Sequence, residues 1–151
     1  MIRPILMAAL LAATSLPALA QDAKTASGGV VIVPAAEAAK RLATVPTSTT
    51  IITTGSYITL LSHRTVDGTP EQHANWTDVM VMQHGEVTFT YGGTISGNTV
   101  DDKGESHGGA ITGGTTVTLH AGDYLLVPAG TPHLMTAPKG DFRYFVTKVH
   151  I

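Results

Sequence analysis

The sequence predicts an all-β protein, an antiparallel sandwich or barrel preceded by a short N-terminal helix. From Thr49 onward Thr, Val, Ile, Tyr and Phe dominate, and glycines mark off segments of strand length. No stretch in this region keeps a helical period for long. Many short strands separated by turn signals are typical of closed or double-layered β folds.

Residues 1–20 have the layout of a secretory signal peptide. A basic start with Arg3 precedes an apolar stretch and the small-residue end Ala18-Leu19-Ala20. The apolar stretch is shorter than the roughly 20 residues that span a bilayer. We therefore expect a periplasmic or secreted protein that begins near Gln21 and is not held by a membrane; a buried N-terminal helix is the alternative.

The remaining chain divides into a leader, 21–48, and a barrel domain, 49–151. In the leader, Val30 to Val33 predicts a strand, and Pro34 before AAEAAKRLA predicts a short helix, because proline is tolerated at a helix start. The barrel strands are predicted at Thr50–Thr53, Tyr57–Arg64, Trp76–Gln83, Glu86–Tyr91, Thr115–Leu119, Tyr124–Val127 and Arg143–His150.

Composition narrows the function classes. The formal net charge is −2, and no basic cluster indicates a nucleic-acid partner or an anionic membrane surface. Cysteine is absent, which excludes disulfides, thiol catalysis and thiolate metal ligands. Any metal must be bound through nitrogen and oxygen.

Turn-forming residues predict two tight reversals and one long excursion. HGE at 84–86 and PKGD at 138–141 are typical of turns between antiparallel strands. Residues 92–114 are polar and rich in glycine, and an excursion of this length in a small barrel is usually either a functional loop or a disordered one.

Two patterns suggest a shared site. GDYLLVPAGTPH runs from Gly122 through an apolar strand to Pro128 and then to His133, and PEQHANWTD places Glu71 and His73 before Asp78. Alternate residues of a strand point to one face, so Glu71 and His73 project together. Two imidazoles with one or two carboxylates at a barrel rim are suitable ligands for a divalent metal.

These patterns resemble the paired motifs of the cupin superfamily, over about Ser56 to His150. The second motif is matched at Gly122, Pro128, Gly130 and His133, and departs at Ala137, where its longer form has asparagine. In the first motif His73 keeps the place of a histidine ligand, whereas Glu71 stands where histidine is usual and Asp78 where glutamate is usual.

The resemblance implies a cupin-type antiparallel β-barrel, also called a jelly roll or double-stranded β-helix, with one site at its mouth. It implies Fe, Mn, Zn or Ni held by His73, His133, Asp78 and Glu71. Asp78 and Glu71 are also the candidate catalytic residues, and Asp78 is alternatively a residue that orients His73. The pocket residues are predicted as Met80, Met82, Phe89, Tyr91 and His107.

We therefore expect a protein that binds a small organic molecule beside a divalent metal, with dioxygenase, isomerase or lyase activity left open. A metal-free binding or sensor protein is the main alternative. A barrel that serves only for dimerisation is a third possibility, and cupins commonly form homodimers.

Overall fold

The computed structural model describes residues 24–25, 29–43 and 47–151. The predicted signal peptide, 1–20, lies outside the described residues. The leader contains β1 (Lys24–Thr25), which pairs with β2 (Val31–Ile32), followed by α1 (Ala35–Arg41). The predicted short helix is confirmed, and Pro34 is its N-cap residue. No helix among the described residues is long and apolar enough to cross a membrane.

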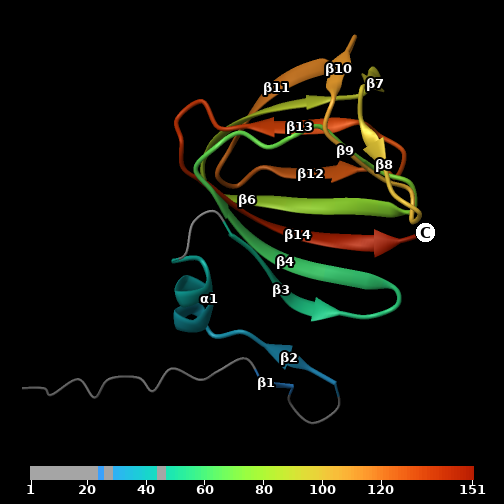
Figure 1. Ribbon diagram of the computed structural model, residues 1–151. Helices are drawn as coiled ribbons and strands as arrows, with labels where there is room; N and C mark the ends of the chain where they lie inside the picture. The colour runs from blue at the N-terminus through green and yellow to red at the C-terminus, as the bar shows by residue number, and fades with distance from the viewer. Residues whose placement is uncertain (1–23, 26–28, 44–46) are drawn as a thin grey trace, which may run out of the picture.

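The rest of the chain forms a curled antiparallel sheet that closes into a half-barrel (Figure 1), as the sequence predicted. Its main strand order is β3-β4-β14-β6-β13-β5-β9-β8, with β11 and β12 also paired to β6. The strands are β3 (Thr47–Thr53), β4 (Tyr57–Arg64), β5 (Glu71–His73), β6 (Trp76–Tyr91), β8 (Thr99–Val100), β9 (Glu105–His107), β11 (Thr115–His120), β12 (Tyr124–Val127), β13 (His133–Thr136) and β14 (Phe142–His150).

The long strand β6 joins the two halves of the sheet. Its first part pairs with β12 and β14, and its second part pairs with β11 and β13. The reversal predicted at 84–86 is therefore wrong. A register shift between Arg143 and Tyr144 of β14 and the positive φ of Gly85, 79°, bend β6 there without ending it. Gly85 therefore marks a bend within a continuous strand and not a turn between two strands.

The second predicted turn, at 138–141, is a tight turn held by the Gly140 amide, which donates to the Ala137 carbonyl at 3.0 Å. It links β13 to β14, which both pair with β6 and do not pair with each other.

The glycine-rich excursion, 92–114, is structured. It contains β7 (Thr94–Ser96) paired with β10 (Ala110–Thr112), and β8 paired with β9. β9 also pairs with β5, which extends the main sheet. The excursion thus adds a wall to the half-barrel beside Glu71 and His73.

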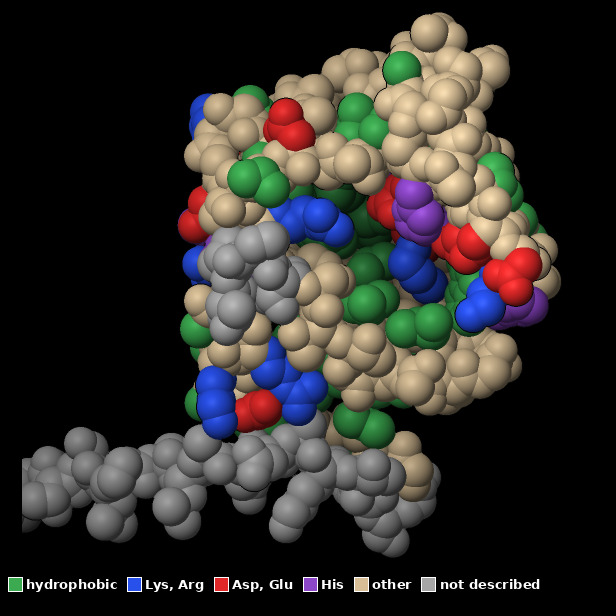
Figure 2. Space-filling model, in the orientation of Figure 1, with side chains coloured by type: hydrophobic (Ala, Val, Ile, Leu, Met, Phe, Trp, Pro, Cys, Tyr) green, Lys and Arg blue, Asp and Glu red, His purple; other side chains and the backbone are tan. Residues whose placement is uncertain are grey.

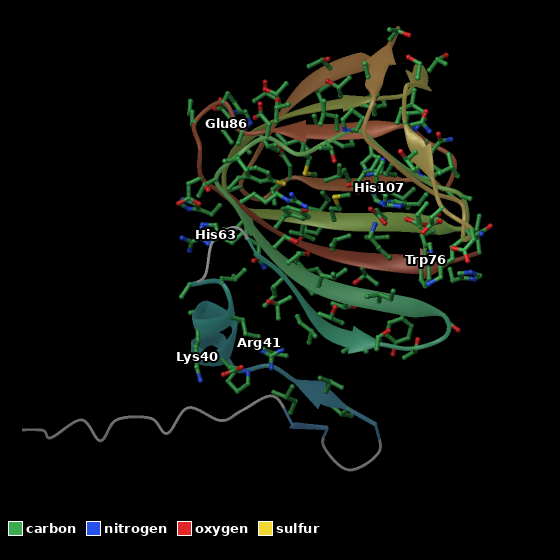
Figure 3. All side chains as sticks on the ribbon, viewed as in Figure 1. Lys40, Arg41, His63, Trp76, Glu86 and His107 are labelled. Carbon is green, nitrogen blue, oxygen red and sulfur yellow. The ribbon has the colours of Figure 1, made fainter. Side chains whose placement is uncertain are left out.

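The hydrophobic core lies between the two halves of the sheet. Inward positions alternate along the strands, as expected for a sheet with one buried face. The buried core residues are Met80, Met82, Val87, Phe89, Val127, Met135, Phe142, Tyr144 and Val146. On the other face of β4, buried His63 contacts the carbonyl of Leu42 at 2.6 Å and so ties the end of α1 to the sheet (Figure 3).

Candidate metal centre and adjoining cavity

Strand pairing places the site residues in facing pairs. His133 of β13 lies opposite Glu71 of β5, and His73 of β5 lies opposite Glu105 of β9. Directly opposed residues of antiparallel strands have side chains on the same face, with their Cβ atoms about 5 Å apart. The register of β13 with β5 therefore brings His133 to Glu71, and the register of β5 with β9 brings His73 to Glu105.

Glu71, His73 and His133 form a group that has the composition of a metal site. Their ligand atoms all lie within 4.8 Å of one another. His133 Nε2 is 3.4 Å from Glu71 Oε1, and His73 Nε2 is 3.9 Å from Glu71 Oε2. Both histidines are buried, at 4% and 1% exposure for His73 and His133. Two imidazoles and one carboxylate converge here, and Asp78, the fourth predicted ligand, is not one of the group.

One ring nitrogen of each histidine is held by a hydrogen bond that fixes its tautomer. His133 Nδ1 donates to the Thr131 carbonyl at 3.0 Å, so the lone pair of the neutral ring is on Nε2. His73 Nδ1 donates to Glu105 Oε2 at 2.5 Å, which likewise leaves the lone pair on Nε2. Ligand histidines in metal sites are commonly oriented by such bonds.

The Nε2 atom of His133 is buried and forms no hydrogen bond. Leaving a buried polar atom unpaired costs about 1–3 kcal/mol, so such an atom in a concave site indicates a missing partner. A divalent cation bound by His133 Nε2 and by the Glu71 carboxylate would supply the partner that this nitrogen lacks. The side chains present therefore fit a metal with nitrogen and oxygen ligands.

Lys148 is the second feature of the site. It lies opposite Asp78 in the pairing of β14 with β6, and its Nζ donates to both Asp78 carboxylate oxygens, at 2.9 and 2.8 Å. The same ammonium donates to His73 Nε2 at 2.7 Å. Asp78 is almost fully buried and lies beside the group of Glu71, His73 and His133, with its oxygens engaged by Lys148 rather than turned toward an open position.

The carboxylates of the site are held in the ionised form. Burial opposes ionisation of Glu71, but its interaction with His133 and the charges of Lys148 and His73 lower its pKa to about 2. Burial likewise opposes ionisation of Asp78, while His73 and Lys148 hold its pKa below the ordinary value. For His73, burial and the charge of Lys148 lower the pKa, but the neighbouring carboxylates of Asp78 and Glu105 outweigh both and leave the pKa raised. Near neutral pH the site therefore presents two negative carboxylates to one lysine.

A cavity of about 190 Å³ adjoins this group. Leu60, Val146 and Met80 lie side by side on β4, β14 and β6 and form its apolar floor. Its wall is polar and charged, and the space-filling view shows basic side chains around a hollow in this face (Figure 2). The polar and charged residues that line it are Ser48, Ser62, Arg64, Thr69, Glu71, Asp78, His133, Tyr144 and Lys148.

The predicted pocket residues fall in different places. Met80 lines this cavity, while Met82 is packed in the core. Phe89 and Tyr91 stack on each other with ring centroids 5.7 Å apart and line a second, apolar cavity between β11 and β12. His107 is exposed on β9, opposite Glu71, and is not one of the grouped ligands (Figure 3).

Three residues of the site were not anticipated from the sequence. In β14, Lys148 occupies an alternate position on the same inward face as Phe142, Tyr144 and Val146. A lysine on a buried strand face is unusual, so the alternation of the sequence could have revealed it. Arg64 has the inward parity of Leu60 and Ser62 in β4, as the lining of the cavity shows. Glu105 carries no such signal, because the pairing of β9 with β5 is not readable from local sequence.

Comparison with known proteins finds similar folds among solved structures. No protein-family model and no curated protein matches the sequence. Among solved structures, BH2720 from Bacillus halodurans matches with a TM-score of 0.57 at 12% identity, over 83% of this chain and 85% of that one. The cupin domain of Schizosaccharomyces pombe Cnp3 matches with 0.53 at 10% identity, over 69% and 64%.

KdgF from Halomonas sp. matches with a TM-score of 0.50 at 16% identity, over 69% of this chain and 79% of that one. At these identities the likeness is one of fold, and the activity of the chain has to be argued from its own residues.

Proposed function

Because the chain has the cupin fold, we propose that it binds a small organic molecule beside a divalent metal held by Glu71, His73 and His133. The observation that carries the proposal is the convergence of these three ligand groups within 4.8 Å, with His133 Nε2 buried and unpaired. The adjoining cavity supplies the space for the organic molecule.

The ligand set favours a first-row metal with open positions. Two histidines and one carboxylate form the facial set known from non-haem iron sites, and Mn, Zn or Ni are also compatible with nitrogen and oxygen ligands. A metal in this place would act as a Lewis acid toward a bound oxygen atom of the ligand. Oxygenase, isomerase and lyase reactions are all consistent with that chemistry.

The surrounding residues have separable roles in this proposal. Glu105 and the Thr131 carbonyl orient the two imidazoles through their Nδ1 atoms. Asp78 holds the Lys148 ammonium in place by accepting two hydrogen bonds from it. The Lys148 side chain lines the cavity, and its Nζ donors are directed at Asp78 and His73.

Metal content tests the proposal directly. Protein purified without a histidine tag is analysed for metals as isolated and after dialysis against Zn²⁺ or Mn²⁺. We expect about one metal ion per chain in the wild type and a loss of binding in His133→Ala and Glu71→Gln. His120→Ala is the matched control, because His120 is an exposed histidine on β11. Substoichiometric metal that is unchanged by His73→Ala would contradict the proposal.

A second candidate is a metal-free binding protein, and Lys148 favours it. The Lys148 ammonium already donates to His73 Nε2 and to both oxygens of Asp78. An internal cation thus neutralises part of the site without a metal. Ligand binding that is retained in the presence of a chelator, with no metal in the purified protein, would support this candidate over the first.

Export remains part of the proposal and is supported by the layout of residues 1–20. Cell fractionation and N-terminal sequencing of the expressed protein test it, with a mature start near Gln21 as the expected result. A protein that keeps Met1 and stays in the cytoplasm would contradict it.

A further inference from the structure

Arg64 is a cation of the cavity that has no carboxylate partner in the part of the chain that the structure describes. It is the last residue of β4 and is half-buried, with its side chain lining the cavity. Its Nε donates to Tyr144 Oη at 3.4 Å, and among the described residues no carboxylate lies within 4.0 Å of its guanidinium. Burial opposes its charge, while Tyr144 and Glu71 raise its pKa, so Arg64 stays charged.

The other cation of the cavity already has a carboxylate partner. Lys148 is bound to Asp78, whereas Glu71 faces the imidazole of His133 rather than a lysine or arginine. Among the described residues that line the cavity, Arg64 is therefore the cation that remains available to a ligand. A guanidinium presents a planar set of donors that matches the two oxygens of a carboxylate.

The shape of the cavity restricts the rest of the ligand. Its volume of about 190 Å³ is below the roughly 300–1,000 Å³ of pockets for drug-sized molecules, so the ligand is small. The apolar floor of Leu60, Met80 and Val146 suits a short hydrocarbon segment. The polar wall at Ser62 and Tyr144 adds hydroxyl groups next to Arg64.

We propose that Arg64, with the Tyr144 hydroxyl beside it, is the carboxylate-binding subsite of the cavity, and that the ligand is a short-chain aliphatic carboxylic acid. The carboxylate pairs with the Arg64 guanidinium, the hydrocarbon lies on the apolar floor, and the far end of the molecule is directed toward Glu71 and His133. This inference rests on the proposed small-molecule function and names the class of ligand.

Calorimetric or NMR titration with butyrate tests the subsite, with butyramide as the uncharged isostere. We expect butyrate to bind the wild type more tightly than butyramide by a factor of about ten or more. The reason is that only the carboxylate forms a charged hydrogen-bonded pair with the Arg64 guanidinium. Arg64→Gln should weaken butyrate about tenfold or more and leave butyramide unchanged. Lys139→Gln is the charge-matched control, because Lys139 is exposed and pairs with Glu86 away from the cavity.

Two further variants keep the test decisive. Arg64→Lys retains the charge and should show an intermediate loss, even if Arg64→Gln folds poorly. Tyr144→Phe should weaken butyrate by a smaller factor. Equal butyrate affinity in the wild type and in Arg64→Lys and Arg64→Gln overturns the proposal, as does equal binding of butyrate and butyramide.

The same titrations in chelator and after Zn²⁺ loading separate this inference from the metal proposal. We expect the Arg64-dependent loss under both conditions. If butyrate binding requires Zn²⁺ and is insensitive to Arg64, the carboxylate binds the metal; the Arg64 subsite is then overturned and the metal proposal stands. If no metal binds but Arg64 controls butyrate, the metal proposal fails and the subsite stands.

Discussion

Lys148 donates to His73 Nε2 across 2.7 Å and thereby joins β14 to β5, two strands that do not pair with each other. The bond crosses the mouth of the half-barrel between residues that are 75 positions apart in the sequence. It engages the same nitrogen lone pair that a metal would need. Lys148 therefore competes for His73 with the metal of the proposed function.

Replacing Lys148 should strengthen metal binding. In Lys148→Met the His73 Nε2 lone pair is released and the site loses one positive charge, so we expect Zn²⁺ affinity to rise about tenfold or more, consistent with charge effects at short range. Titration against a competing chelator measures this, with Lys139→Gln as the surface control. Weaker Zn²⁺ binding by the variant would show that Lys148 supports the metal rather than competing with it.

The pair of Asp78 and Lys148 should show strong energetic coupling. Removing one partner leaves an uncompensated charge at a position where Asp78 is 1% exposed, and we expect Asp78→Asn or Lys148→Met in metal-free protein to lower the free energy of unfolding by about 3 kcal/mol. The double variant should recover much of that loss. Denaturant unfolding of all four proteins measures the coupling, and additive effects of the two changes would contradict it.

Glu105→Gln should lower metal affinity without changing the fold. Glu105 holds the Nδ1 proton of His73, and loss of such an orienting carboxylate typically costs about 10–100-fold in metal affinity. Glu86→Gln serves as a control, because Glu86 pairs with exposed Lys139 outside the site. Unaltered Zn²⁺ affinity in Glu105→Gln would remove Glu105 from the set of positioning residues.

Stability of the metal-free protein should fall in acid. The pKa of Glu71 is lowered from 4.5 to about 2, and that of Asp78 is also lowered, so the native state binds fewer protons than the unfolded chain. Their contribution is present in full above the ordinary carboxyl pKa and is lost as the pH falls from about 4.5 toward 2. Thermal unfolding with chelator from pH 7 to pH 2 measures it. Glu71→Gln should flatten the dependence, and an equally steep curve would contradict the assignment.

Gly85→Ala should destabilise the fold at the bend of β6. Gly85 has a φ of 79°, and an added Cβ would lie 2.1 Å from the Asp141 carbonyl oxygen. Strained backbone alone costs about 1–3 kcal/mol, and the clash adds to it, so we expect a loss of about 2 kcal/mol or more in the free energy of unfolding. Gly55→Ala is the matched control, because its Cβ would meet nothing within 4 Å. A loss of stability equal to that of the control would contradict the role of Gly85.

Much of the fold could be predicted because its signals are local. Alternation and turn residues located β4 and β12 at their observed bounds and α1 after Pro34. Motif spacing singled out His73 and His133, which the structure brings to ring centroids 5.3 Å apart. The bend of β6 was misread as a turn, since a glycine with positive φ serves equally in a turn and in a bulge. The strands within 92–114 were missed because they are short and rich in glycine.

The sequence by itself determined which side chains face inward, because a strand places alternate residues on one face. By this alternation Lys148 and Arg64 face inward, as His73 and Glu71 do. Only the tertiary structure decided which inward groups meet. The pairing of β9 with β5 puts Glu105 on His73, and the curl of the sheet carries the end of β14 to the mouth, where Lys148 reaches Asp78 and His73. Such contacts depend on strand order and closure, which no local pattern encodes.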